Sequence, residues 1–305
     1  MPFDLSDKLV IGISSRALFD LERENAIFES AGVLPYADYQ RRHEDEALAP
    51  GTAFPLVEAL LGLNRLIADK QFVEVVLMSR NSPDTGLRAM NAIEKTELPV
   101  TRAAFTGGEP IPRYLQAFKV DLFLSKSAED VQAAIDAGFA AALLYAPPDH
   151  RPDQPGAQIR IAFDGDAVLF SPESEEIYKT RGLEAFVAHE RENRLVAMGE
   201  GPFAKLLLML SELQKQFPAK ECPVRIAIVT ARSSPAHARV IHTLRAWSVA
   251  VDEAFFLGGV NKDEVLESFG AHIFFDDQDV HVARAARKVP SAKVPYRGGG
   301  PGASA

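Results

Sequence analysis

The feature that most constrains the fold of this chain is an internal repeat, in which matching strings recur about 150 residues apart. IGISSRALF, from Ile11, matches IAFDGDAVLF, from Ile161. SRNSP from Ser79 matches ARSSP from Ala231, and AAFTGG from Ala103 matches AFFLGG from Ala254. Strand–turn–helix patterning makes any two α/β halves look periodic, but it does not keep such strings in one register. We therefore predict a duplication, which is a two-unit array and too short for a solenoid.

Short apolar runs rich in β-branched residues alternate with longer helical patterns in both halves. The predicted strands are Leu9–Ile13, Val73–Met78, Leu122–Leu124, Ile159–Phe163, Arg225–Val229 and His272–Phe275. Helical patterns cover Pro55–Ala68, Phe203–Gln214, Pro235–Ala246 and Lys262–Phe269. This alternation predicts an α/β fold with two Rossmann-like halves, mostly parallel sheets and small helical cap insertions.

The domain boundary is expected near the proline-rich stretch Ala146–Gly156. We assign residues 1–150 to the first half, residues 151–295 to the second half, and residues 296–305 to a flexible, glycine-rich tail. At 305 residues the chain is also longer than most single domains.

Composition and charge narrow the functional classes. The formal net charge of −9 argues against nucleic-acid binding, which needs a basic face. Cys222 is the only cysteine, so an intramolecular disulfide is excluded, and a single free thiol fits a reducing compartment. The first residues do not have the pattern of a signal peptide, and no apolar run approaches the ~20 residues that span a bilayer. We therefore expect a soluble, cytoplasmic protein with no membrane partner.

Four polar features of the second half follow predicted strands or open a predicted helix. They are Asp164 with Asp166, Thr230, Lys262, and Asp276 with Asp277. Each feature alone is an ordinary turn, cap or solvated residue. In this order they all belong to the carboxyl edge of a parallel sheet, where such folds bind ligands.

The same residues resemble the four motifs of the haloacid dehalogenase-like (HAD) phosphatase superfamily. Longer strings are similar to the cytosolic 5′-nucleotidase I family, among them FDGDAVLFSPESE, TARSSPAHARVIHTLRAW, DEAFFLGGVNK and HIFFDDQ. In the first half, ISSRALFDLERENAIFE, MSRNSPDTGLR and TRAAFTGGE also resemble that family, so the similarity covers nearly the whole chain. It implies a Mg²⁺-dependent phosphoric monoester hydrolase that converts nucleoside 5′-monophosphates to nucleoside and phosphate.

The resemblance also implies a role for each site residue. Asp164 would be the nucleophile that forms an aspartyl-phosphate, and Asp166 the general acid and base. Thr230 would hold a phosphoryl oxygen, and Lys262 would offset negative charge. Mg²⁺ would be held by Asp164, the Asp166 carbonyl and Asp276, with help from Asp277. The sequence does not decide which of Asp276 and Asp277 binds the ion directly; Asp276 is the expected ligand. Lys205, at the start of a helix, is a weaker alternative to Lys262.

Substrate contacts are expected from the charged helical segment after Asp164 and from the loop after Thr230. Phe170 and Tyr178 either stack on a base or pack their helix onto the sheet. Arg232 and Ser233 are expected to bind substrate.

The first half has lost the acids of the second half. In the repeat register Asp164 falls on Ser14, Asp166 on Arg16, Thr230 on Met78, Lys262 near Ile111, and Asp276–Asp277 on Ser125–Lys126. The first half therefore cannot perform the same chemistry. It is either a scaffold with a decayed pocket or an anion site for a nucleotide effector. That site would consist of Ser14, Arg16, Arg80, Asn81 and Lys126, because arginine pairs well with phosphate oxygens.

Three questions stay open at this point. The enzyme could act on another small phosphate ester, such as a sugar phosphate. The chain could instead be a nucleotide-binding sensor with little hydrolysis, although a sensor has no need of both Asp164 and Asp166. Base and sugar preference and the formation of a homo-oligomer are not decided by the sequence.

Overall fold

The computed structural model describes residues 3–66, 71–148 and 158–297 of the chain. Contacts divide the chain into a unit that runs to Leu144 and a second unit, Tyr145–Tyr296. Much of the expected linker Ala146–Gly156, the end of the helix expected over Pro55–Ala68 and most of the expected tail lie outside the described residues. The assignment of domains to residues 1–150 and 151–295 therefore stays a prediction.

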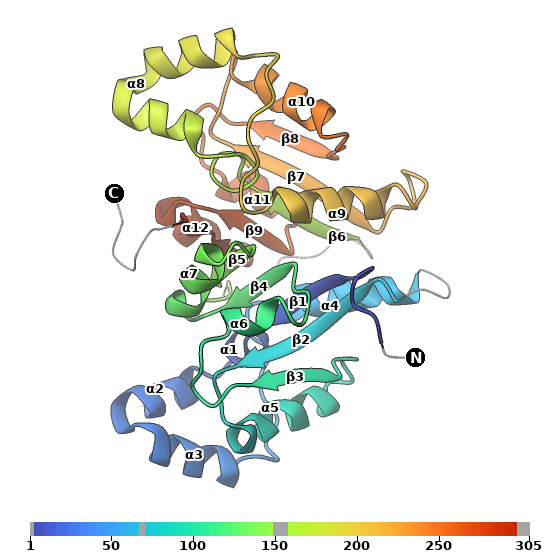
Figure 1. Cartoon of the computed structure of the whole chain (residues 1–305), viewed down its shortest axis with the longest axis vertical. Coiled ribbons are helices and arrows are strands. Elements are labelled where there is room, and N and C mark those ends of the chain that lie inside the picture. Colours follow the sequence, from blue (N-terminus) through green and yellow to red (C-terminus); the bar gives the residue numbers. More distant parts are fainter. Residues whose placement is uncertain (1–2, 67–70, 149–157, 298–305) are drawn as a thin grey trace. The chain divides into compact units, whose positions relative to one another are not determined.

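The first unit contains a five-stranded parallel sheet (Figure 1). Its strands lie in the order β3-β2-β1-β4-β5. The strands are β1 (Leu9–Ile13), β2 (Val73–Ser79), β3 (Arg102–Phe105), β4 (Leu122–Ser125) and β5 (Ala141–Leu144). The helices are α1 (Ser15–Leu18), α2 (Glu22–Ala31), α3 (Val33–Arg42), α4 (Phe54–Gly62), η1 (Leu63–Arg65), α5 (Pro83–Lys95), α6 (Pro112–Leu115) and α7 (Ala128–Asp136).

The second unit repeats this order. Its strands lie in the order β10-β9-β6-β7-β8, and the pairs within the unit are parallel. They are β6 (Ile159–Phe163), β7 (Val224–Thr230), β8 (Glu253–Phe256), β9 (Ile273–Asp276) and β10 (Ser291–Lys293). The helices are α8 (Glu173–Glu192), α9 (Ala204–Gln214), α10 (His237–Ala246), α11 (Asp263–Phe269) and α12 (Asp279–Ala285).

Read from β3 in the first unit and from β8 in the second unit, both sheets have the strand order third, second, first, fourth, fifth. The first strand of each unit has its second strand on one side and its fourth on the other. The predicted α/β fold with two similar halves and parallel strands is confirmed. No helix in the described residues is long and apolar enough to cross a membrane.

The strand register corrects one pairing of the repeat. Ser79 ends β2 opposite Phe105, and Thr230 ends β7 opposite Phe256. The residue two positions later donates its N–H to the strand-end hydroxyl in both units, at 3.2 Å. Thr230 therefore corresponds to Ser79 and not to Met78, and Arg232 corresponds to Asn81. The alignment of SRNSP with ARSSP shifts these residues by one position. The reason is that the loop between Thr230 and Pro235 is one residue longer than the loop between Ser79 and Pro83.

Apolar residues pack both faces of the second sheet around the ends of β6 and β9. Ala162 lies beside Phe274 and belongs to a buried cluster with Leu266. On the opposite face Phe163 stacks on Phe275, with ring centroids 5.5 Å apart. Side chains alternate between the faces of a strand, so this packing fixes the direction in which the next residues leave the sheet.

Each unit also carries a helical segment between its first two strands. In the first unit Gly32, at φ +83°, joins α2 to α3. In the second unit Gly182, at φ +80°, interrupts α8 in the same place. Figure 1 shows α8 as two helical pieces that meet at a bend. This backbone conformation favours glycine, so the bend is specified by sequence. The predicted cap insertion thus corresponds to α8, which we call the α8 segment.

Candidate active site

Three carboxylates of the second unit come together where β6 and β9 end. Asp164 follows β6 and donates its N–H to the Phe275 carbonyl at 2.8 Å. Asp276 ends β9 and Asp277 follows it, and all three side chains are buried. The strand order changes direction between β6 and β9, and ligands of parallel α/β sheets bind at such a switch point.

Lys262 joins two of these carboxylates. It precedes α11, and its Nζ donates to Asp164 Oδ1 at 2.8 Å and to Asp276 Oδ2 at 2.6 Å. Only 5% of the residue is exposed. Lys205 on α9 is exposed. The buried ammonium therefore belongs to Lys262, and it neutralises part of the acidic cluster.

The donor set of the cluster fits a divalent cation. Asp164, Asp276 and Asp277 each offer one oxygen within 4.8 Å of the others. Both oxygens of Asp276 are already bonded, Oδ2 to Lys262 and Oδ1 to the Gln278 N–H at 2.8 Å. Asp277 Oδ2 accepts from the Tyr296 hydroxyl, whereas its buried Oδ1 has no hydrogen-bond partner among the described residues. A buried unpaired carboxylate oxygen is costly unless it binds a ligand.

Burial and mutual repulsion perturb the acids. Burial is the main cause that raises the pKa of Asp164 to about 7; Asp276 and Asp166 add to it and Lys262 opposes it. Burial, with repulsion from Asp164 and Asp276, raises the pKa of Asp277 to about 8. Burial also acts to raise the pKa of Asp276, but Lys262 and His281 outweigh it and the pKa is lowered. A cation would relieve the repulsion that two of these groups experience.

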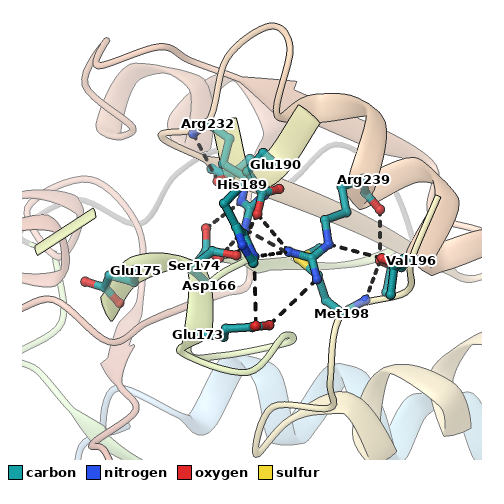
Figure 2. Close-up of polar contacts among 12 residues, drawn as sticks. Asp166, Glu173, Ser174, Glu175, His189, Glu190, Val196, Met198, Arg232 and Arg239 are labelled. Atoms are coloured by element: carbon teal, nitrogen blue, oxygen red, sulfur yellow. Dashed lines mark hydrogen bonds and ion pairs between the residues drawn. The ribbon is translucent and has the colours of Figure 1, made fainter. Parts of the chain in front are cut away.

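The Asp166 side chain lies outside this cluster and is bound by Arg232. Arg232 Nε donates to Asp166 Oδ2 at 2.7 Å, and Nη2 donates to Oδ1 at 2.6 Å (Figure 2). Thr230 is buried at the end of β7, and its hydroxyl accepts the Arg232 N–H. Thr230 and Asp166 thus share Arg232 as a neighbour.

The residues expected to bind substrate separate into buried and exposed groups. Phe170 is fully buried and packs on Trp247, with ring centroids 5.5 Å apart. The base-stacking role considered for Phe170 does not fit this position, because the ring is part of the core. Tyr178 is 52% exposed and contacts Phe186 edge-on, so its role stays a prediction. Ser233 is exposed, and Arg232 is buried against Asp166.

The first unit assembles part of the predicted anion site. Arg16 and Lys126 both bind Glu22, at 3.0 Å and 2.8 Å. Ser14 caps α1. Two other members point to different partners: Arg80 pairs with Glu129 and Asp130, and Asn81 accepts from the Tyr36 hydroxyl at 3.0 Å.

Several residues around the site were missed by sequence reasoning. Tyr296 was assigned to the tail, yet its hydroxyl contacts Glu175 and Asp277. His281 Nδ1 lies 3.3 Å from Asp276 Oδ2, and Glu190 and Arg239 extend the contacts of Arg232. One signal was available in the sequence: Arg239 lies in a helical pattern and matches Arg88 of the other repeat.

The fold and the site together define a Rossmann-like α/β protein with the aspartate, threonine and lysine set of the HAD-like superfamily. The chain belongs to the 5′-nucleotidase family, whose model matches residues 1–299. It is 38% identical over 291 residues to human cytosolic 5′-nucleotidase 1B, covering 92% of this chain. The matched region is 47% of the human protein, so the chain spans about half the length of this relative.

The predicted family resemblance is thereby confirmed. A solved structure titled "Structure of Pnkp1/Rnl/Hen1 complex" contains a chain that aligns over 95% of this chain and 97% of its own length, at 13% identity and a TM-score of 0.33. So weak a likeness carries no argument.

Proposed function

We propose that this chain is a Mg²⁺-dependent 5′-nucleotidase that hydrolyses nucleoside 5′-monophosphates through an aspartyl-phosphate on Asp164. The observation that carries the proposal is the buried cluster in which Lys262 bridges Asp164 and Asp276, while one oxygen of Asp277 has no hydrogen-bond partner in the part of the chain that the structure describes. A merely structural ion pair needs no third, unpaired carboxylate at its side. Family membership and similarity to a relative named a cytosolic 5′-nucleotidase support the substrate class and a cytosolic location.

The chain's own residues can account for both chemical steps. An Asp164 oxygen attacks phosphorus as the bond from phosphorus to the 5′-oxygen breaks. Asp166 delivers a proton to the departing 5′-oxygen and then takes one from the water that hydrolyses the acyl phosphate. The Thr230 hydroxyl and the Lys262 ammonium are available to bind phosphoryl oxygens at the same edge of the sheet.

We propose that Asp164 and Asp277 are the side chains that hold Mg²⁺, with the Asp166 carbonyl beside them. The free Oδ1 supports Asp277, whereas both Asp276 oxygens already accept hydrogen bonds. This differs from the expectation that Asp276 is the main ligand. When bound, the ion would neutralise charge on the phosphate and on the nucleophile.

Phosphate release tests this function directly. A panel of nucleoside 5′-monophosphates and sugar phosphates is assayed with Mg²⁺ and with EDTA, for wild type and Asp164→Asn. Asp38→Asn is the control, because that side chain is half-exposed on α3, in the first unit. We expect Mg²⁺-dependent release from nucleotides that is lost only in Asp164→Asn. Release from sugar phosphates alone would reject the nucleotide substrate, and binding without release would favour a sensor.

We further propose that Arg16 and Lys126 form an anion site for a nucleotide effector in the first unit. Glu22 forms ion pairs with both Arg16 and Lys126. Among the described residues, the buried Arg16 Nε has no hydrogen-bond partner. An effector phosphate would replace the Glu22 carboxylate as their counter-ion. A scaffold role is the alternative.

A further inference from the structure

The guanidinium of Arg232 binds two carboxylates from different parts of the second unit with all three of its nitrogens. Two of its nitrogens bind both oxygens of Asp166, and the third, Nη1, binds Glu190 of the α8 segment. Its side chain is 2% exposed. A substrate phosphate could therefore reach Arg232 only by displacing Asp166, so a direct substrate contact fits this geometry poorly.

Glu190 in turn holds Arg232 in place. Glu190 is completely buried, and its second oxygen accepts from Ser174 Oγ at 2.7 Å and from Arg239 Nη1 at 2.9 Å. Arg239 also binds the Val196 carbonyl and His189, as Figure 2 shows. Two arginines and two acids thus balance their charges, and the orientation of Asp166 depends on contacts made by the α8 segment.

The first unit shows what the same framework keeps when no catalytic acid is present. Arg88 matches Arg239, and it still binds the matching helical segment through Gln40 at 3.0 Å and Glu24 at 2.7 Å. At the position of Asp166 stands Arg16, and at the position of Arg232 stands Asn81. Holding the helical segment therefore needs only the arginine at the 88/239 position. The arginine at the 81/232 position is present only where the acid is present.

We propose that Arg232 is a positioning residue, which orients the Asp166 carboxylate for proton transfer to the leaving 5′-oxygen and is itself oriented by Glu190. The fork of two parallel hydrogen bonds fixes the plane of the carboxylate, which a single-point cation cannot do. This inference rests on the proposed nucleotidase function and deepens it. As Asp164 bonds to phosphorus, the bond from phosphorus to the 5′-oxygen breaks, and a proton passes from one Asp166 oxygen to that 5′-oxygen. This Asp166 oxygen accepts its hydrogen bond from Arg232 once the proton has left, which completes the fork.

The test compares two substrates that differ only in the leaving atom. One is a nucleoside 5′-monophosphate, and the other has sulfur in place of the bridging 5′-oxygen, so that a thiolate departs without needing a proton. Arg232→Lys keeps the buried charge but loses the fork. Arg239→Lys is the matched control, because Arg239 binds the same Glu190 and is equally buried, at 3% exposure, without a hydrogen bond to Asp166.

We expect Arg232→Lys to lower the single-turnover rate of leaving-group release from the oxygen ester by about 100-fold, with KM changed by less than about threefold, since general acid–base catalysis contributes about 10²–10⁴-fold. The loss in the same single-turnover rate for the sulfur substrate should stay under about fivefold, because the thiolate departs without a proton from Asp166 before the shared hydrolysis of the aspartyl-phosphate. Arg239→Lys should affect both substrates equally. Adding Arg232→Lys to Asp166→Asn should cost nothing further, as for residues that act as one unit. Should Arg232→Lys fail to fold, Glu190→Gln is expected to give the same split with a smaller loss of about tenfold.

Each other outcome has a definite meaning. Equal losses on both substrates would reject the positioning role and leave Arg232 structural. A raised KM for both substrates, or losses that multiply in the double variant, would make Arg232 a substrate-binding residue. A wild type that hydrolyses neither compound would overturn the proposed function, and this inference with it.

Discussion

Without Mg²⁺, the stability of this protein should fall as the pH rises from about 4 to about 8, because the acidic cluster ionises at a higher pH in the folded protein than in the unfolded chain. Burial is the largest cause that raises the pKa of Asp164 to about 7 and that of Asp277 to about 8. In the unfolded chain both carboxyls have a pKa of about 3.9. Between these values the folded state binds more protons than the unfolded state, so the free energy of unfolding decreases with increasing pH.

The size of the effect follows from the same values. Above pH 6 the loss runs up to the folded-state pKa of each group, about one unit for Asp164 and about two units for Asp277, at about 1.4 kcal/mol per unit. The sum is on the order of 4 kcal/mol and is an upper limit, because the two groups interact. Bound Mg²⁺ should oppose the loss, since it binds the ionised carboxylates and so stabilises the folded state more at high pH.

Urea unfolding at pH 6, 7.5 and 9, in EDTA and in Mg²⁺, measures this dependence. Asp277→Asn is the matched control: titrating groups outside the cluster change equally in both proteins, so the difference in slope reports Asp277 together with its effect on Asp164. We expect the variant to be less pH-sensitive in EDTA and to gain less from Mg²⁺. A wild-type stability in EDTA that is flat or rises over this range would refute the reasoning and would mean that the acids are ionised throughout.

Two further predictions concern residues with open roles. Phe170→Ala should lower the free energy of unfolding by about 3–5 kcal/mol and leave KM unchanged, because Phe170 is a core residue. Tyr178→Ala should leave stability unchanged and raise KM if its exposed ring contacts the base. Thermal unfolding and steady-state kinetics of the two variants separate these cases. Arg16→Ala should weaken nucleotide binding by the Asp164→Asn protein, measured by calorimetry, and reduce the response of wild-type activity to added nucleotides; if neither changes, the first unit is a scaffold.

The strands that could be predicted are those with strong apolar runs. Leu9–Ile13 and Ile159–Phe163 match β1 and β6 at both ends, since these central strands are buried on both faces. The strands β3 and β8 were not predicted: their residues are only half-buried, and Arg102 and Glu253 interrupt the apolar pattern. Helix ends were accurate within one or two residues for α9, α10 and α11.

The site was predictable to the extent that it depends on strand ends. Asp164, Lys262 and Asp276 are in direct contact because parallel strands end at the same edge. The sequence could not show which oxygen stays free, because that depends on hydrogen bonds from Gln278 and Tyr296. It also could not show that Arg232 binds Asp166, since the two are 66 residues apart and the loop between matched strings differs in length by one residue.

Charge balance between neighbouring side chains accounts for a paired difference between the two repeats, in which positions 16 and 81 of the first unit differ together from positions 166 and 232 of the second. In the second unit a buried arginine at 232 requires the acids at 166 and 190, since an unpaired buried charge costs several kcal/mol. In the first unit position 16 became arginine, so an arginine at 81 would have faced another cation, and asparagine stands there instead. Glu22 then neutralises Arg16 locally. An aspartate at position 16 alone would lack both the arginine that binds it in the second unit and the acidic cluster beside it, so we expect that a single substitution would not give the first unit the proposed chemistry.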